Sequence, residues 1–413
     1  MTIVRPFKAI RPTPALASRV ISLPYDVMNR EEAAQMAGNN PMSFLHICRS
    51  EIDLPEQKNP YDESVYLKAR DNIARFLAEG TFLQDEEPTL YIYRQTMGPN
   101  TQTGIVGCVS IDDYQNDIIK KHEYTREEKE QDRIRHFDVC NANTEPVFLT
   151  HRANNELGEL IDKYIGAHDA EFDIKTNDGV GHIFWVIRDN SVRDRIVEIF
   201  KEIPALYIAD GHHRSASACK VGLKRREANP GYTGEEEFNF FMAVIFPDKD
   251  LNIFDYNRVV RDLNGLTTEE FIKAVIDAGF QVELQGTSIY RPAQKHEISM
   301  YMGDSWYKLT ATSKIVTNHP IDGLDVAILQ SHLLAPILGI ADPRTDKRID
   351  FVGGIRGLVE LERRVATDMK VAFALFPVTI ADLLSVSDNG MVMPPKSTWF
   401  EPKLGSGLFI HQL

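Results

Sequence analysis

Five residues whose side chains or backbone can take part in chemistry follow one another at positions 210–214: Asp210, Gly211, His212, His213 and Arg214. A short apolar run at 205–208 precedes them and is long enough for a buried strand. The residues at 215–221 are mostly small and compatible with a helix. The pattern therefore predicts a strand-to-helix turn that carries all five residues.

A turn of this kind is suited to bind phosphate. The free backbone N–H groups at a helix start, including that of Ser215, favour an anion. Gly211 can adopt backbone angles closed to other residues, and Arg214 offers a planar fork of donors. Asp210 could hold a divalent cation or accept a proton. The alternative is a structural turn in which Arg214 pairs with a surface carboxylate, but five consecutive functional residues in one turn favour a nucleotide-phosphate site.

A second dense segment, 120–126, lies where a strand-like region gives way to a charged helix. Its two lysines can neutralise phosphate, and Glu123 could act as a general base toward a hydroxyl group. Alone, the segment fits a solvated helix start with Thr125 as the cap. Together with the Asp210 turn, it predicts a joint site in which Glu123 lies near that turn.

Two weaker candidates for an anion or substrate contact lie elsewhere in the chain. Arg49 ends a segment, 40–49, whose conformation the pattern leaves open. Lys396 lies in a tail, 393–408, that is rich in proline and glycine but too apolar to be free. We expect this tail to dock on the body, either to bring a lysine to the site or for packing alone.

Several familiar sites are excluded. The chain contains no Walker loop, no GxGxxG, no HExxH and no protein-kinase signature pair. The cysteines are far apart and form no CxxC pair, which predicts reduced thiols and no zinc site. They are Cys48, Cys108, Cys140 and Cys219.

Composition bounds the class of protein. The net charge of -14 argues against a general binder of nucleic acid or anionic membranes. The beginning of the sequence lacks the apolar region of a signal peptide, and no run is long enough to cross a membrane. We therefore expect a cytoplasmic protein with small-molecule partners, and homo-oligomerisation stays open.

Periodicity predicts alternating helices and strands, and hence an α+β or mixed α/β fold. With 413 residues, the chain should form two or three domains. We expect an N-terminal α/β region (1–85), a nucleotide-binding core (86–262) and a C-terminal α+β region with the docked tail (263–413). Helices are predicted at 29–37, 64–79, 126–136, 191–203 with Ser191 as cap, 267–278 and 324–338. Strands are predicted at 90–95, 104–111, 147–150, 205–208, 240–246, 371–376 and in a hairpin over 297–311.

The chain resembles the DUF1015 family nearly end to end. The resemblance rests on separated motifs: Arg5–Pro12, Leu23–Val27, Lys121–Thr125, the 210–214 turn and Pro394–Thr398. Some members of that family are associated with ATP-dependent phosphorylation of free L-serine. The turn also resembles the phosphate-binding turn of the ParB/sulfiredoxin-like fold, which includes free serine kinases.

The resemblance implies a ParB/sulfiredoxin-like core with large N- and C-terminal additions and a kinase that phosphorylates free serine, with ATP as co-substrate and Mg²⁺ as cofactor. Asp210 would be the catalytic or metal-linked aspartate, and residues 211–214 would hold nucleotide phosphates. Glu123 would be the base, although only the His-Glu pair matches. The choice of ATP or ADP as donor and the serine-binding residues stay unassigned. The alternative function is a ParB-like nucleotide-binding switch or adaptor without kinase activity.

Overall fold

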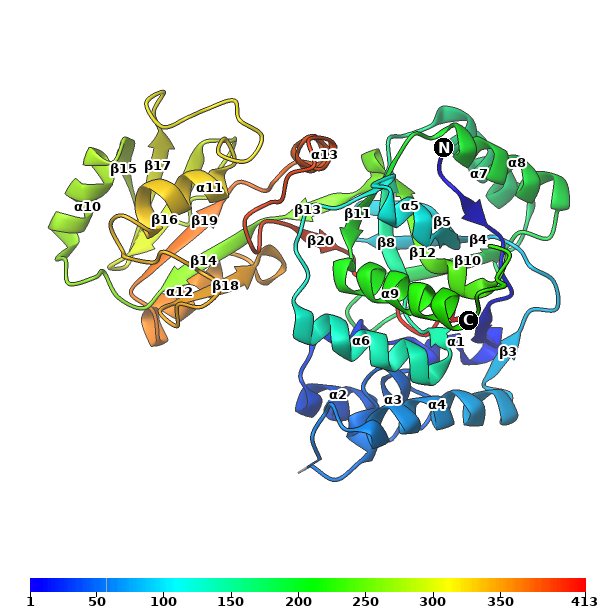
Figure 1. Ribbon diagram of the computed structural model, residues 1–413. Coiled ribbons are helices and arrows are strands. Elements are labelled where there is room, and N and C mark those ends of the chain that lie inside the picture. Colours follow the sequence, from blue (N-terminus) through cyan, green and yellow to red (C-terminus); the bar gives the residue numbers. More distant parts are fainter. Residues whose placement is uncertain (57) are drawn as a thin grey trace. The chain divides into compact units, whose positions relative to one another are not determined.

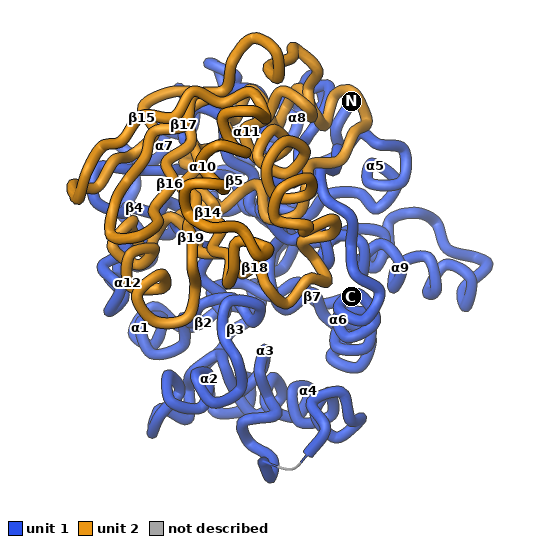
Figure 2. Tube along the Cα trace, turned by 90° about the vertical axis from the view of Figure 1, so that its left-hand side faces the viewer, with its two compact units in different colours: residues 1–251, 402–413 blue, residues 252–401 orange. Residues whose placement is uncertain are grey.

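A nine-stranded mixed sheet carries the 210–214 turn. The computed structural model describes residues 1–56 and 58–413 (Figure 1). The chain forms two units, coloured separately in Figure 2: Met1–Leu251 together with Pro402–Leu413, and Asn252–Glu401. We call them unit 1 and unit 2, and the mixed α/β class predicted from periodicity is confirmed.

The sheet of unit 1 has the order β6-β11-β8-β12-β5-β4-β10-β9, with β1 paired to β5. The pairs β11–β6 and β12–β8 are parallel, and the other pairs are antiparallel. The strands are β1 (Val4–Arg5), β4 (Tyr91–Met97), β5 (Asn100–Ser110), β6 (Ile119–Lys120), β8 (Val147–His151), β9 (Phe172–Lys175), β10 (Gly181–Val186), β11 (Leu206–Asp210) and β12 (Phe240–Pro247).

The central strands of this sheet are apolar on both faces. All residues of β8 are buried, as are all of β12 except its last. Strands covered on both sides read as continuous apolar runs, which is why the predictions at 147–150 and 240–246 are confirmed. β11 is buried up to Asp210, whose side chain emerges at the strand's end.

Helices α6 and α9 lie side by side in unit 1, and α4 packs on α6 (Figure 1). Two short strand pairs, β2–β3 and β7–β21, join distant segments. The helices are α1 (Ala17–Val20), α2 (Arg30–Ala37), α3 (Leu45–Cys48), α4 (Glu63–Ala78), α5 (Ile111–Gln115), α6 (Glu127–Cys140), α7 (Asn155–Ala167), α8 (Asn190–Glu202) and α9 (His212–Ala228). The short strands are β2 (Ile10–Pro12), β3 (Phe82–Gln84), β7 (Ala142–Asn143) and β21 (His411–Gln412).

Two of the expected helix caps are wrong. The cap of α8 is Asp189, two residues before the predicted Ser191, and its carboxylate accepts from the backbone N–H groups of Ser191 and Val192. The N-cap of α6 is Arg126, and the Thr125 hydroxyl instead donates to Glu130. A carboxylate within reach thus competes with the backbone for a hydroxyl group.

Unit 2 holds a six-stranded antiparallel sheet, ordered β15-β17-β16-β19-β14-β18, and a two-stranded pair, β13–β20. The predicted hairpin is confirmed: Gly303 and Asp304 both have positive φ between β16 and β17. The elements are β13 (Asn252–Phe254), β14 (Tyr256–Val260), β15 (Phe280–Gly286), β16 (Glu297–Met302), β17 (Ser305–Ala311), β18 (Ile349–Gly353), β19 (Val371–Leu375), β20 (Trp399–Glu401), α10 (Thr268–Asp277), α11 (Asp325–Leu329), α12 (Val359–Thr367) and α13 (Ile380–Asp388).

The helix predicted at 324–338 is shorter than expected. α11 ends at Leu329, and a π-helical turn, Gln330–Leu334, follows it. Pro336 lacks a backbone N–H and crowds the preceding turn, so a regular helix cannot continue through it. In the part of the chain that the structure describes, no helix has the length and apolar character needed to cross a membrane.

The grouping into units differs from the ranges 1–85, 86–262 and 263–413. Residues 1–85 share unit 1 with the central sheet, and the chain enters unit 2 at Asn252. The tail divides: Trp399 and Phe400 belong to unit 2, whereas residues 402–413 return to unit 1. Strand pairs such as β1–β5 and β7–β21 cause this grouping, and composition along the chain does not reveal them.

Candidate functional site

The turn between β11 and α9 has the geometry that the sequence predicts. β11 ends at Asp210, Gly211 is the N-cap residue, and α9 begins at His212. Gly211 has φ of 94° and ψ of 31°, a left-handed conformation that side chains rarely adopt. Its N–H donates to Asp210 Oδ1 at 3.0 Å. Gly211 has no side chain with which to cap the helix, so no N-cap side chain occupies the N–H groups of the first turn.

Arg214 lies inside this turn rather than on the surface. Its Nη1 donates to the Pro146 carbonyl at 2.6 Å, and its Nη2 lies 3.5 Å from Asp210 Oδ2. Its Nε is buried without a hydrogen-bond partner among the described residues. The Ser215 hydroxyl donates back to the Gly211 carbonyl at 3.2 Å. Arg214 therefore pairs with the aspartate of its own turn, not with a surface carboxylate.

A second cation reaches the turn from the C-terminal segment of unit 1. Lys403 Nζ lies 3.6 Å from Asp210 Oδ2. Burial acts to raise the pKa of Asp210, but Lys403 and Arg214, followed by His212 and the Gly211 N–H, bring it well below its usual range. Asp210 is therefore an ionised carboxylate held between two cations. Phosphate oxygens could replace it as their partner.

Three histidines tie the 122–126 segment to the start of α9. The His122 N–H donates to His212 Nε2 at 3.4 Å, and the two rings meet edge to face, 4.4 Å apart. The Arg126 N–H donates to His213 Nε2 at 3.0 Å. Burial lowers the pKa of all three, that of His122 to about 4. The imidazoles are therefore neutral near pH 7.

The structure places Glu123 beside the turn, although 87 positions separate it from Asp210. Its Oε2 lies 3.9 Å from His212 Nδ1, and 49% of its side chain is exposed. One of the segment's two lysines contacts an aromatic ring: Lys121 Nζ lies over the Tyr114 ring, 4.2 Å from its centre. His122, Glu123 and the Arg126 N–H are thus the parts of this segment that contact His212 and His213 at the start of α9.

Behind the turn lies a buried charge cluster that the sequence did not indicate. Glu145 Oε1 accepts from the Tyr25 N–H at 3.1 Å and from the Ser406 hydroxyl at 2.9 Å. Its Oε2 lies 3.7 Å from Arg133 Nη1. Burial raises the pKa of Glu145, and Arg214 and Arg133 oppose that rise. Arg133 lies in a charged helix typical of a solvated face, so its pattern gave no signal. The sequence indicates Tyr25 only as part of the Leu23–Val27 motif.

The two weaker candidates contact groups outside the 210–214 turn. Arg49 is in unit 1, where its Nη2 pairs with Glu51 at 2.8 Å and its Nη1 donates to the Tyr25 carbonyl at 3.3 Å. Lys396 is in unit 2, exposed, with its Nζ 5.5 Å from the centre of the Tyr256 ring. The tail lysine that lies beside Asp210 is Lys403 instead.

The described residues include no group of three or more His, Cys, Asp or Glu side chains that could hold a metal ion. Asp210 alone, already paired with two cations, is a weak metal site. Mg²⁺ commonly takes one or two carboxylates and completes its shell with substrate phosphates and water. The donor set here thus fits Mg²⁺ only as an ion that arrives with a nucleotide.

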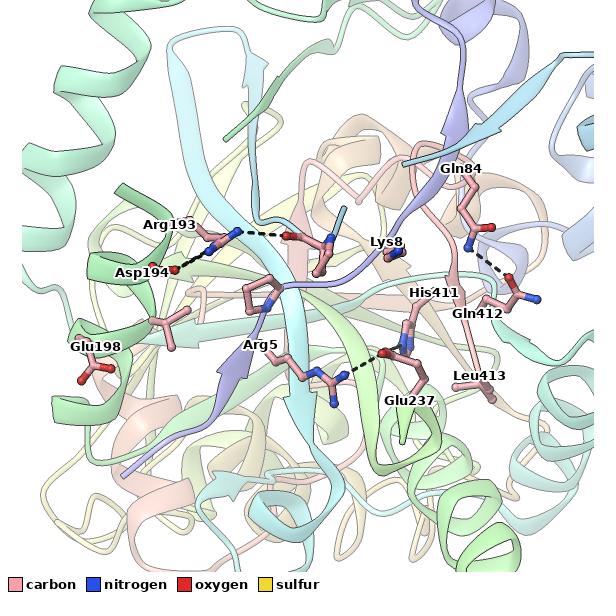
Figure 3. Close-up of a pocket in the computed structure, with 13 residues that line it drawn as sticks. Arg5, Lys8, Gln84, Arg193, Asp194, Glu198, Glu237, His411, Gln412 and Leu413 are labelled. Carbon is pink, nitrogen blue, oxygen red and sulfur yellow. Dashed lines mark hydrogen bonds and ion pairs between the residues drawn. The ribbon is translucent and has the colours of Figure 1, made fainter. Parts of the chain in front are cut away.

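A cavity of about 760 Å³ elsewhere in unit 1 contains none of these residues (Figure 3). Glu237 accepts there from Arg5 at 2.8 Å and contacts His411 Nε2 at 2.8 Å. Gln84 donates to Gln412 at 3.2 Å. Arg5, Glu237 and His411 therefore satisfy one another in this cavity.

A family described as a protein of unknown function, DUF1015, matches residues 4–327. The chain belongs to the DUF1015 family. The matched part contains the 210–214 turn, the 121–125 segment and the Tyr25 motif, but not the tail. No curated protein matches the sequence of this DUF1015 member.

Solved structures resemble the chain remotely. A conserved hypothetical protein from Pyrococcus furiosus is 12% identical, with a TM-score of 0.37, over 75% of this chain and 95% of that one. C-terminally truncated SbnI from Staphylococcus aureus is 12% identical, with a TM-score of 0.38, over 74% and 87%. A free serine kinase in complex with AMP is 12% identical, with a TM-score of 0.36, over 74% and 92%. Likeness at this level does not establish a shared activity.

Proposed function

We propose that this DUF1015 protein is a small-molecule kinase that transfers a phosphoryl group from a nucleotide, ATP in the first instance, to the hydroxyl of free L-serine. One observation carries the proposal: Arg214, Lys403 and the Gly211 N–H gather around Asp210, and Glu123 lies beside His212 at the edge of the same turn. The acceptor follows from the resemblance of the Asp-Gly-His-His-Arg turn to that of free serine kinases.

The turn would bind the nucleotide by its phosphates. The N–H groups at the start of a helix and its dipole favour an anion, and Gly211 leaves room for close approach. Lys403 Nζ and the guanidinium of Arg214 would neutralise phosphate oxygens. The neutral imidazoles of His212 and His213 would serve as hydrogen-bonding groups rather than as charges.

The transfer would need positioning and charge neutralisation more than covalent chemistry. The serine hydroxyl oxygen attacks the γ-phosphorus, the bond from that phosphorus to the β,γ-bridging oxygen breaks, and ADP leaves. Glu123 takes the hydroxyl proton, and the products are phosphoserine and ADP. A half-exposed carboxylate next to a neutral histidine is accessible to a substrate hydroxyl.

Magnesium would supply neutralisation of the phosphate charge. In our proposal the nucleotide phosphates and water hold most of its coordination sphere, and Asp210 contributes one carboxylate. Asp210 would then bind the magnesium ion in place of Lys403 and Arg214, because phosphate oxygens would pair with these two cations.

The test is incubation of the full chain with ATP or ADP, Mg²⁺ and a panel of amino acids, with phosphoamino acid and released nucleotide as readouts. We expect product with serine only. Glu123→Gln should keep nucleotide affinity and lose on the order of a hundredfold in rate. The matched control is Glu128→Gln, a carboxylate exposed on α6.

Nucleotide binding without turnover for any acceptor would contradict the kinase and favour the nucleotide-dependent switch. A Glu123→Gln variant as fast as the Glu128→Gln control would remove Glu123 from the chemistry. Absence of nucleotide binding would contradict both functions.

A further inference from the structure

A small polar cavity of about 130 Å³ lies in unit 1, next to Tyr25. Its buried part comes from the segment 48–51, from α4 and from α6, and its rim carries exposed Pro60 and Lys129. Drug-sized ligands occupy cavities of roughly 300–1,000 Å³, so this one suits a much smaller molecule. Volume thus excludes a nucleotide as its occupant.

Two acid–base pairs line this cavity. Arg49 Nη2 lies 2.8 Å from Glu51 Oε1, and Arg133 Nη2 lies 2.8 Å from Asp132 Oδ2. Arg49 also has a donor to spare: its Nε is buried and lacks a hydrogen-bond partner among the described residues, whereas Arg133 Nη1 lies 3.7 Å from Glu145 Oε2. A buried guanidinium donor is costly to leave unpaired, so Arg49 Nε calls for an acceptor in the cavity.

The cavity adjoins the charge cluster behind the Asp210 turn. The Arg133 guanidinium lies 3.9 Å from the centre of the Tyr25 ring, and the Tyr25 N–H donates to Glu145. Arg214 acts electrostatically on both Tyr25 and Glu145. Tyr25 therefore belongs both to the cavity and to the cluster that contacts the phosphate turn.

We propose that this cavity binds a free α-amino acid as its zwitterion. The carboxylate takes the spare Nε–H donor of Arg49 and faces the positive charge of Arg133, and the ammonium group is held by Glu51 and Asp132. The balance of charge favours this ligand: two carboxylates would repel a phosphate, and two guanidinium groups would repel a simple amine. The inference rests on the proposed kinase, for which the cavity supplies the acceptor.

The experiment measures binding to the full chain by calorimetry with three probes: L-serine, 3-hydroxypropanoate, which lacks the ammonium group, and ADP. L-serine should bind the wild-type chain more tightly than 3-hydroxypropanoate. Arg49→Ala should lower the binding affinity for both acids by roughly tenfold or more. Glu51→Gln should weaken the binding of L-serine alone. It should therefore narrow the difference in affinity between L-serine and 3-hydroxypropanoate.

The matched control is Arg70→Ala, an exposed arginine on α4 that pairs with Asp71 and does not line the cavity. ADP affinity should be unchanged in all three variants. Unchanged ADP binding would also show that the variants are folded. L-serine affinity that is equal in Arg49→Ala, Glu51→Gln and Arg70→Ala would overturn the cavity assignment. So would the absence of binding by any α-amino acid to the wild-type chain.

The two proposals fail differently. Serine-dependent turnover with an unchanged Michaelis constant in Arg49→Ala and Glu51→Gln would overturn the cavity and leave the kinase standing. Amino-acid binding that depends on Arg49 and Glu51, without turnover, would support the cavity and contradict the kinase.

Discussion

At the scale of single residues, the charge state of the turn is set by what surrounds Asp210. Its carboxylate stays ionised because two cations and a backbone N–H outweigh the effect of burial. The two cations differ: the Arg214 side chain is 3% exposed and also donates to the Pro146 carbonyl, whereas the Lys403 side chain is 14% exposed. Substitutions of the two should therefore have different consequences.

Lys403→Ala should weaken nucleotide binding by about 1.5–3 kcal/mol, the usual size of a hydrogen bond to a charged group. The fold should change little, since Lys403 fills no core position. Calorimetric titration with ADP measures the effect, with Lys224→Ala, exposed near the far end of α9, as the control. Equal affinities in the two variants would place the phosphates elsewhere.

Arg214→Ala should destabilise the protein by about 3–5 kcal/mol, as expected when one partner of a buried ion pair is removed. Asp210 and Glu145 would each lose a compensating charge. Denaturant unfolding measures the free energy. A variant as stable as the wild type would mean that water or Lys403 replaces the charge of Arg214 beside Asp210 and Glu145.

His122 should make stability depend on pH. Its pKa in the folded chain, about 4, lies below the unfolded value of 6.5, because burial disfavours the imidazolium. The unfolded state therefore binds more protons between these values, and the stability present above pH 6.5 is lost as pH falls. From pH 7 to pH 5 the loss from this group is about 2 kcal/mol.

Unfolding free energies of wild type and His122→Gln at pH 7 and pH 5 check this expectation. The variant should lose less stability over the interval. Equal losses would mean that His122 titrates normally in the folded chain.

At the scale of elements, the junction of β11 and α9 depends on one left-handed residue. Gly211→Ala should lower stability by about 1–2 kcal/mol for the backbone conformation, and its Cβ would stand 3.0 Å from Arg214 Nε. Gly234→Ala is the matched control, since φ is 96° there and no atom lies within 4 Å of the added Cβ.

Both variants should melt at lower temperature, but only Gly211→Ala should also weaken ADP binding, because it displaces Arg214. Thermal unfolding and calorimetry separate the two effects. If Gly234→Ala weakened ADP binding as much, the displacement of Arg214 would not be the cause.

The elements themselves were largely readable from the sequence. The buried run before Asp210 and the glycine after it mark a strand-to-helix turn by local rules alone. The capping box of α2, with Asn29 and Glu32, was equally local. What local rules could not supply is which distant segment lies beside the turn. Glu145 reaches it through strand order, and Lys403 through the return of the chain to unit 1.

At the scale of the whole molecule, the last residues hold the first unit together. Phe409 is fully buried, with ring centres 5.7 Å from Tyr93 on β4 and 5.9 Å from Phe184 on β10. Phe409→Ala should lower the free energy of unfolding by about 3–5 kcal/mol, as other large core truncations do. Amide hydrogen exchange should accelerate most in β4 and β10.

Phe400→Ala is the comparison variant, because Phe400 is buried in β20 of unit 2. It should accelerate exchange in unit 2 first. Identical exchange patterns in the two variants would mean that the chain opens as one cooperative whole and not by units.

The return of the chain at Pro402 has a consequence for synthesis on the ribosome. Unit 1 begins with the first residues, but 150 residues of unit 2 are made before its closing segment, Pro402–Leu413. Until then Asp210 lacks Lys403, Glu145 lacks the Ser406 hydroxyl, and β7 lacks its partner strand. A nascent chain interrupted in unit 2 would thus have an incomplete phosphate turn and an open edge for chaperones to bind.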